Sequence, residues 1–314
     1  MNSKGTILIT GATGFVGSHL VNRLLSLGYL VLATVRDLDQ CGNHPIIRHS
    51  ISQKNLILFQ SDWEENPLVL EKAISKFKID GLINCVAKQP RPNLGLKDYE
   101  KVNVHTLKNI FEFASRIGSR VFITFSSATV YAPSLGTLIH EGSPVNPVSD
   151  YAKSKLKGEL MLSEISAHLN LATYNFRLPS VYGYGQEGGI AHTYYVFAKA
   201  HESIEVYSNG KLIRNILYID DLANLCETVL SKPAKNGYCS YLFGSKNSLS
   251  MEAIAGLFVK YLSSRSRILL VEKEAPVPLD WNLDLTKIQK DLRAKSRTIE
   301  EGVKDYIQAM EMRS

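Results

Sequence analysis

Three glycines near the start of the chain, in the segment TGATGFVG at Thr10–Gly17, restrict the fold more than any other feature. The preceding residues Thr6–Thr10 are largely β-branched and apolar, which predicts a buried strand. Apolar residues at helical spacing follow and predict a helix packed on a sheet. Gly11, Gly14 and Gly17 therefore lie on a strand-to-helix turn, where backbone N–H groups and a helix N-terminus can meet a diphosphate.

The flanking strand and helix make this turn a specific signal for a dinucleotide, although a tight turn without a ligand is the alternative. The cofactor contacts expected from the turn are Gly11, Thr13, Gly14, Phe15, Val16 and Gly17.

The end of the second predicted strand, Tyr29–Val35, bears on the choice of cofactor. Arg36 can pair with a 2′-phosphate and stack on adenine, which favours NADP(H). Asp37 can instead accept from a ribose hydroxyl, which favours NAD(H). An exposed charge pair without a ligand is a third interpretation. We prefer NADP(H) and keep NAD(H) as the alternative.

Further strands alternate with helices along the first half of the chain. The predicted strands are Leu56–Gln60, Gly81–Val86 and Arg120–Ser126, the helices are Leu68–Phe77, Asp98–Ile117 and Ser149–Leu169, and Asp39–Gln53 is a surface loop. This rhythm predicts an α/β fold with a Rossmann-type doubly wound parallel sheet.

Polar or small residues follow two of these strands. Asp62 can accept from an adenine amino group or cap the next helix. Ala87 is small enough for a nicotinamide to lie close. Lys88 begins a loop at the carboxyl end of a strand, where open α/β sheets bind ligands, so it is a candidate substrate residue.

Catalytic chemistry is indicated where the fifth strand ends and the next long helix begins. Tyr151 and Lys155 are four residues apart and so share one helical face. An ammonium group nearby lowers the pKa of a phenol and makes it a general acid/base for a carbinol/carbonyl pair. Ser127 can donate a hydrogen bond to the same substrate oxygen. A solvated helix face is the alternative interpretation of this spacing.

Composition excludes several other classes of protein. The chain has 314 residues, 45% of them hydrophobic, with a net charge of +6 but no block of basic residues, so nucleic-acid binding is not indicated. The cysteines are far apart and form no Cys-x-x-Cys pair, so we expect neither a disulfide framework nor a metal site. We see no signal peptide and no apolar run of about 18 residues, and we therefore expect a cytoplasmic enzyme without a membrane partner.

These motifs together resemble the extended short-chain dehydrogenase/reductase family, especially its nucleotide-sugar epimerases, dehydratases and reductases. TGATGFVG resembles the family's cofactor turn, SSATVY at Ser126–Tyr131 its catalytic Ser/Thr segment, and Tyr151-Ala-Lys-Ser-Lys155 its Tyr/Lys pair. The resemblance implies that Lys155 also holds the nicotinamide ribose. It implies cofactor contacts from Asp62, Ala87 and Asn103.

Later motifs extend the resemblance. RLPSVYG resembles the family motif beside the nicotinamide, which implies a cofactor contact from Pro179. RNILYIDDLA resembles the family stretch whose arginine contacts a substrate diphosphate, which implies this role for Arg214. A structural arginine is the alternative. The family also implies a homodimer through the 98–117 and 149–169 helices.

We expect residues 1–178 to form the NAD(P)-binding domain and residues 179–314 a smaller α/β substrate domain. The stretch 214–245 partly returns to the first domain, and a short hairpin is predicted at Glu205–Ile213.

Two departures from the family's patterns narrow the subclass. Family dehydratases carry Asp-Glu after the catalytic Thr, where this chain has Ala128 and Thr129, so dehydration is not expected. Family 4-epimerases place an acid where this chain has Val35. The preferred function is therefore NADPH-dependent reduction of a keto group on a nucleotide-activated sugar. The alternatives are an NAD-dependent nucleotide-sugar 4-epimerase, a reductase of a non-sugar carbonyl, and a redox-sensing binding protein without catalysis.

Overall fold

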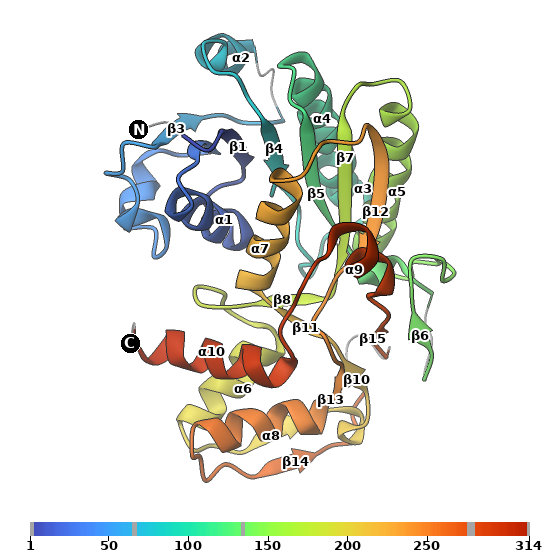
Figure 1. Cartoon of the computed structure of the whole chain (residues 1–314). Coiled ribbons are helices and arrows are strands. Elements are labelled where there is room, and N and C mark those ends of the chain that lie inside the picture. Colours follow the sequence, from blue (N-terminus) through green and yellow to red (C-terminus); the bar gives the residue numbers. More distant parts are fainter. Residues whose placement is uncertain (1–2, 65–67, 133–135, 275–279, 313–314) are drawn as a thin grey trace. The chain divides into compact units, whose positions relative to one another are not determined.

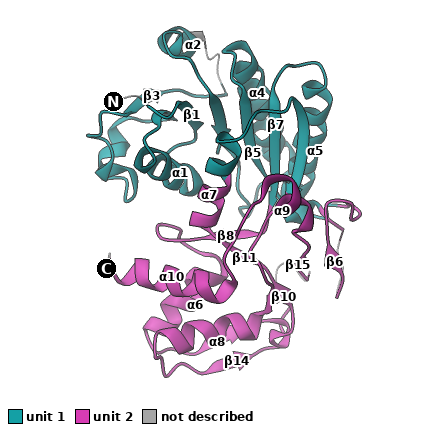
Figure 2. Cartoon of the chain, viewed as in Figure 1, with its two compact units in different colours: residues 1–130, 147–177, 226–241 teal, residues 131–146, 178–225, 242–314 magenta. Residues whose placement is uncertain are grey.

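A computed structural model describes residues 3–64, 68–132, 136–274 and 280–312 (Figure 1). The chain forms two compact units (Figure 2). The first unit comprises residues 1–130, 147–177 and 226–241, and the second comprises residues 131–146, 178–225 and 242–314.

A seven-stranded sheet in the order β12-β7-β5-β4-β1-β2-β3 forms the centre of the first unit. Its strands are β1 (Thr6–Thr10), β2 (Leu30–Val35), β3 (Leu56–Gln60), β4 (Gly81–Asn84), β5 (Val121–Ser127), β7 (Ala172–Leu178) and β12 (Gly237–Leu242). The pairs β1–β2, β2–β3, β1–β4 and β4–β5 are parallel. The strand order reverses between β1 and β4, so the predicted Rossmann-type sheet is confirmed.

Helices cover both faces of this sheet, as buried apolar strands require. The helices of the first unit are α1 (Phe15–Ser26), α2 (Leu68–Ile74), α3 (Leu96–Glu100), α4 (Leu107–Arg116), α5 (Asp150–Ser166) and the end of α7 (Ile219–Leu230). On one face, Leu8 and Phe122 from the sheet pack with Ile110 and Leu162 from α4 and α5. The other face carries α1 and the end of α7 (Figure 1).

The predicted single helix over residues 98–117 is interrupted. A π-helical turn, Lys101–Thr106, joins α3 to α4. Gly158 of α5 packs against this turn, and a Cβ on Gly158 would lie 2.6 Å from the Asn103 carbonyl oxygen. The two helical segments therefore approach at backbone distance, which only glycine permits here.

The predicted loop after β2 also contains regular structure. Residues Asp39–Asn43 and Ile47–His49 form short 3₁₀ turns. Cys41 and Ile47 are buried within them, so the segment is packed rather than extended over the surface.

The second unit combines short paired strands with helices. Its strands are β6 (Leu138–Ile139), β8 (Ser180–Tyr182), β9 (Ile204–Val206), β10 (Ile213–Arg214), β11 (Ile216–Tyr218), β13 (Leu249–Ser250), β14 (Ile268–Leu270) and β15 (Asn282–Leu283). Its helices are the first part of α7 together with α6 (Gly189–Lys199), α8 (Met251–Tyr261), α9 (Thr286–Leu292) and α10 (Ile299–Glu311).

The predicted hairpin at Glu205–Ile213 is wrong. β9 pairs with β14 and β10 pairs with β13, so each strand has a partner far away in the sequence. The remaining pairs are β8–β11 and β6–β15. Edge-to-face contacts of Tyr306 with Tyr182 and Tyr195 lie in the core of this unit.

Among the described residues, no helix is long and apolar enough to cross a membrane.

Candidate active site

Close backbone packing explains the three glycines of the N-terminal turn. Gly11 has φ +65°, and a Cβ there would lie 3.0 Å from the Cys85 carbonyl carbon, just after β4. A Cβ on Gly17 would collide with the Gly11 carbonyl oxygen, and one on Gly14 would lie 3.2 Å from that oxygen. At the three glycines the turn therefore packs backbone against backbone, and this glycine cradle allows the close approach that a diphosphate requires.

The helix that follows presents an open N-terminus. Its N-cap Gly14 supplies no capping side chain, and no acidic residue lies in the first turn. The free N–H groups and the positive end of the helix dipole suit an anion. Three of the six predicted contacts lie on the turn, and Phe15, Val16 and Gly17 form the start of α1, so these residues together fit the diphosphate of a dinucleotide.

At the end of β2 the structure distinguishes Arg36 from Asp37. The Asp37 carboxylate accepts from the Asp39 N–H at 2.9 Å and from Gln40 Nε2 at 2.8 Å. Arg36 is exposed and forms no ion pair or side-chain hydrogen bond within the described part of the chain. The Asp37 carboxylate therefore stabilises the turn that follows it, whereas the Arg36 guanidinium group is available to bind an anion.

The ends of β3 and β4 carry the next predicted contacts. Asp62 is exposed, and its Oδ1 accepts from the Glu64 N–H at 2.9 Å, which is a local turn contact. Ala87 is partly exposed after β4. The roles of Asp62 and Ala87 toward a cofactor remain predictions.

Asn103 joins three elements of the first unit. Its Oδ1 accepts from the Lys88 N–H at 2.8 Å, and its Nδ2 donates to the Lys88 carbonyl at 3.2 Å. The same Nδ2 lies 3.0 Å from Ser154 Oγ, which donates to the Tyr151 carbonyl. The Asn103 side chain is therefore already engaged, and it holds the loop of Lys88 next to the helix of Tyr151. Ser154 was not predicted, because its partner lies 51 residues away.

Ser127 and Tyr151 meet where β5 ends and α5 begins. Ser149 caps α5 by accepting from the Ala152 N–H at 3.2 Å, which places Tyr151 in the first turn. The Thr129 N–H donates to Ser127 Oγ at 3.2 Å, so the hydroxyl is held in place. A hydrogen bond from Ser127 lowers the pKa of Tyr151, but burial outweighs it and raises that pKa to about 12.

This result corrects one expectation from the sequence. Burial, and not the Lys155 ammonium, dominates the pKa of Tyr151. The phenol is therefore protonated at neutral pH, as an ordinary tyrosine is, and burial makes it a weaker acid.

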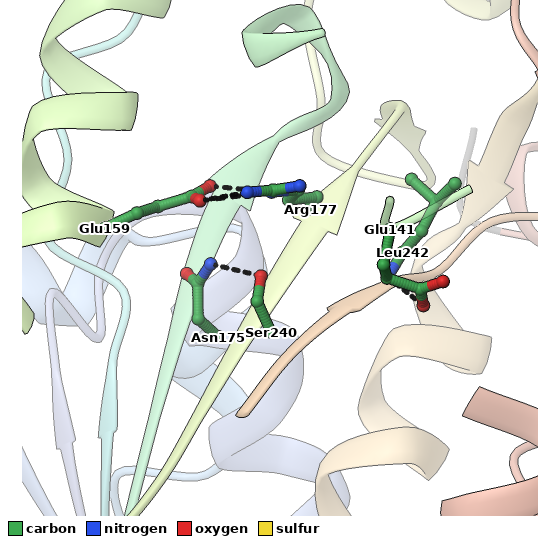
Figure 3. Close-up of polar contacts among 6 residues, drawn as sticks. All are labelled: Glu141, Glu159, Asn175, Arg177, Ser240 and Leu242. Carbon is green, nitrogen blue, oxygen red and sulfur yellow. Dashed lines mark hydrogen bonds and ion pairs between the residues drawn. The ribbon is translucent and has the colours of Figure 1, made fainter. Parts of the chain in front are cut away.

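Lys155 is buried one turn further along α5, at 7% exposure. Burial lowers its pKa to about 8, and the nearby Glu159 carboxylate opposes this shift. Figure 3 shows Glu159 paired with Arg177 of β7, whose Nη2 donates at 2.7 Å. In the same view Asn175 Nδ2 lies 3.1 Å from Ser240 Oγ, which links β7 to β12.

The Glu159–Arg177 pair was not predicted from the sequence. Its two side chains lie 18 residues apart, on α5 and β7, so no local pattern in the sequence indicates the pair.

Pro179 and Arg214 belong to the second unit. Arg214 lies on β10, its Nη1 donates to the Ile213 carbonyl at 3.2 Å, and burial lowers its pKa against the effect of Asp280. The buried Tyr194 hydroxyl has no hydrogen-bond partner among the described residues. Burial raises the pKa of Tyr194 to about 12, and the Arg214 guanidinium opposes this shift. In the second unit, Glu141 accepts from the Leu242 N–H at 3.0 Å (Figure 3).

The cysteines and the other metal-ligating residues suggest no further centre. Cys41, Cys85, Cys226 and Cys239 are free thiols. Within the described ranges, no three His, Cys, Asp or Glu side chains gather as a metal ion would need.

Comparison with known proteins defines the family. The model of the NAD dependent epimerase/dehydratase family matches residues 7–241, and the chain belongs to this family. It is 29% identical over 319 residues to an uncharacterized protein of Methanocaldococcus jannaschii, covering 96% of this chain and 94% of that protein. It is 28% identical to the protein CapI of Staphylococcus aureus, covering 73% and 70% of the two chains.

The fold is shared with solved enzymes. A UDP-glucuronic acid 4-epimerase of Bacillus cereus, solved with UDP-glucuronic acid and NAD, matches with a TM-score of 0.82 at 21% identity, covering 98% of this chain and 99% of that one. The expected fold and the expected class of NAD(P)-dependent enzyme are confirmed.

Proposed function

We propose that this enzyme reduces a keto group on a nucleotide-activated sugar with NADPH. The observation that carries the proposal is the joint placement of Ser127, Tyr151 and Lys155 in the unit that also contains the glycine cradle. When bound, the nicotinamide supplies the hydride. The chain's own groups then have to hold the carbonyl and deliver a proton to its oxygen.

Each of the three side chains has a distinct task in this proposal. Ser127 orients the carbonyl oxygen by a hydrogen bond, and Tyr151 donates the proton to that oxygen. Tyr151 carries its proton at neutral pH, but burial raises its pKa, so donation requires a positive charge that stabilises the tyrosinate. Lys155 holds the nicotinamide ribose and supplies positive charge beside the tyrosinate that is left behind.

The preference for NADPH is supported by the end of β2. The exposed Arg36 is available to a 2′-phosphate, whereas both oxygens of Asp37 already accept hydrogen bonds from the following turn. A phosphate–guanidinium contact of this kind combines charge with hydrogen bonding.

The substrate class is supported by the relatives and by the second unit. Solved structures of the same fold contain UDP-glucose or UDP-glucuronic acid. Arg214 and the unpartnered Tyr194 hydroxyl are suited to a diphosphate of such a substrate. Ala128 and Thr129 stand after Ser127 and offer no carboxylate, so we do not propose dehydration.

We further propose the first unit as the cofactor domain and the second as the substrate domain.

A nucleotide-sugar 4-epimerase is the second candidate. It is favoured by the bound NAD in the solved 4-epimerase of the same fold. Such an enzyme would use the same three side chains but would start by removing a proton, which needs a tyrosinate.

Cofactor binding distinguishes the two candidates. We expect the nucleotide-free protein to bind NADPH more tightly than NADH, as measured by fluorescence titration. Replacing Arg36→Ala removes a charge-assisted contact and should weaken NADPH binding about 10- to 100-fold while leaving NADH unchanged. Retained NAD without any preference for NADPH would support the epimerase instead.

A further inference from the structure

One imidazole outside the reacting groups connects the segment after β2 with the glycine turn. His44 Nδ1 accepts hydrogen bonds from the N–H groups of Ile46 and Ile47, each at 3.2 Å. Its Nε2 lies 3.0 Å from the Thr13 carbonyl oxygen. Because Nδ1 serves as an acceptor, the neutral ring carries its proton on Nε2 and donates it to Thr13.

The Thr13 carbonyl belongs to the peptide unit between Thr13 and Gly14, the N-cap residue of α1. The N–H of the same unit, on Gly14, donates to the Gly11 carbonyl at 3.0 Å. Both sides of this peptide are therefore bonded, and its plane cannot rotate without breaking a hydrogen bond. The next peptide unit is also held, because the Gly14 carbonyl accepts from the Ser18 N–H at 2.9 Å, and the N–H groups of Phe15 and Val16 follow directly on these two bonded units.

The segment that carries His44 is itself anchored on α1. Asn22 Nδ2 donates to the Ile46 carbonyl at 3.1 Å, and Asn22 Oδ1 accepts from Ser50 Oγ at 2.7 Å. The side chains of Ile46 and Ile47, which belong to this segment, are buried. The imidazole is thus held from the side opposite to Thr13, and it can act as a fixed support for the turn.

We propose that His44 is a positioning residue for the nucleotide diphosphate, because it holds the Thr13–Gly14 peptide so that the first N–H groups of α1 face the ligand. The inference rests on the proposed binding of a nicotinamide dinucleotide. It involves only the diphosphate turn, so its effect is the same for NADH, NADPH and ADP. Arg36, in contrast, affects NADPH alone.

Two replacements separate the hydrogen bonds of the ring. In His44→Asn, the side-chain oxygen can replace Nδ1 as acceptor for Ile46 and Ile47, but the contact with Thr13 is lost. In His44→Gln, the side-chain amide can still donate to Thr13, but the acceptor for Ile46 and Ile47 is lost. Melting of each cofactor-free variant by circular dichroism shows whether the fold is kept.

The test is titration of the full chain and both variants with NADH, NADPH and ADP. We expect His44→Asn to weaken all three by a similar factor of about three to ten, the size of one lost neutral hydrogen bond. We expect His44→Gln to bind close to the wild-type strength even where its melting temperature is lower.

Two results would overturn this assignment while leaving the proposed function intact. One is wild-type affinity in His44→Asn. The other is equal weakening in both variants, which would mean that the packing of the segment matters and the Thr13 contact does not. A wild-type protein that binds none of the three nucleotides would instead refute the proposed function, and the role of His44 with it.

Discussion

At the scale of a single residue, Lys155 is required for the proposed reaction but lowers the stability of the fold. Its ammonium is buried, and its pKa falls to about 8 from 10.5. Below about pH 8 the folded protein therefore contains the buried positive charge of Lys155, which lowers its free energy of unfolding. Lys155→Met should raise the free energy of unfolding by at most about 3 kcal/mol at pH 7 and abolish turnover.

The pH dependence of this gain follows from linkage. Between about pH 8 and 10.5 Lys155 is more protonated in the unfolded state than in the folded state, so the unfavourable contribution of this side chain to wild-type stability becomes smaller as the pH rises. The advantage of Lys155→Met should therefore shrink across this range. Urea unfolding at several pH values measures it, and an advantage that grows with pH would contradict the assignment.

The buried Glu159–Arg177 pair gives a second prediction at this scale. The two side chains are 5% and 11% exposed, so Glu159→Gln removes a negative charge from beside the buried Arg177 guanidinium. We expect a loss of about 3 kcal/mol of unfolding free energy. The control is Asp150→Asn, which breaks the exposed pair with Lys153 and should change stability by less than about 1 kcal/mol. Equal losses in the two variants would be inconsistent with this account.

At the scale of elements, the sequence predicted best what depends on local pattern. β1 and β3 have the predicted limits, because their apolar runs are bounded by turn residues. The hairpin at 205–213 failed, because β9 and β10 find their partners more than thirty residues further along the chain. Tyr151 and Lys155 could be predicted because they share one helix. The His44 contact spans 31 residues and depends on tertiary packing, so no local pattern shows it.

The π turn between α3 and α4 gives a prediction at the same scale. Alanine usually stabilises a helix relative to glycine by about 1 kcal/mol. Gly158→Ala should nevertheless destabilise the protein, because its Cβ would press on the Asn103 carbonyl. Gly256→Ala on α8 is the matched control, since a Cβ there meets nothing within 4 Å, and it should stabilise. Thermal melting compares the two variants, and a gain in both would mean that the close approach imposes no restriction.

At the scale of the whole molecule, we expect a homodimer formed through α4 and α5. Leu160 supports this, because it is an apolar side chain on α5 that is 62% exposed in the single chain. Light scattering should give twice the chain mass of 35.0 kDa, and Leu160→Glu should shift it toward that of one chain. Leu270→Glu replaces an exposed leucine of the second unit and should leave the mass unchanged. A wild-type monomer would rule out this interface.

The central claim is hydride transfer to a carbonyl carbon assisted by Tyr151. The most direct measurement uses NADPH deuterated at the transferable position, a 4-keto nucleotide sugar and mass spectrometry of the product. The account predicts a nucleotide sugar that carries a hydroxyl group and the deuterium at the former carbonyl carbon, and loss of this product in Tyr151→Phe with cofactor binding retained. Unlabelled product, or unchanged label transfer in Tyr151→Phe, would contradict it.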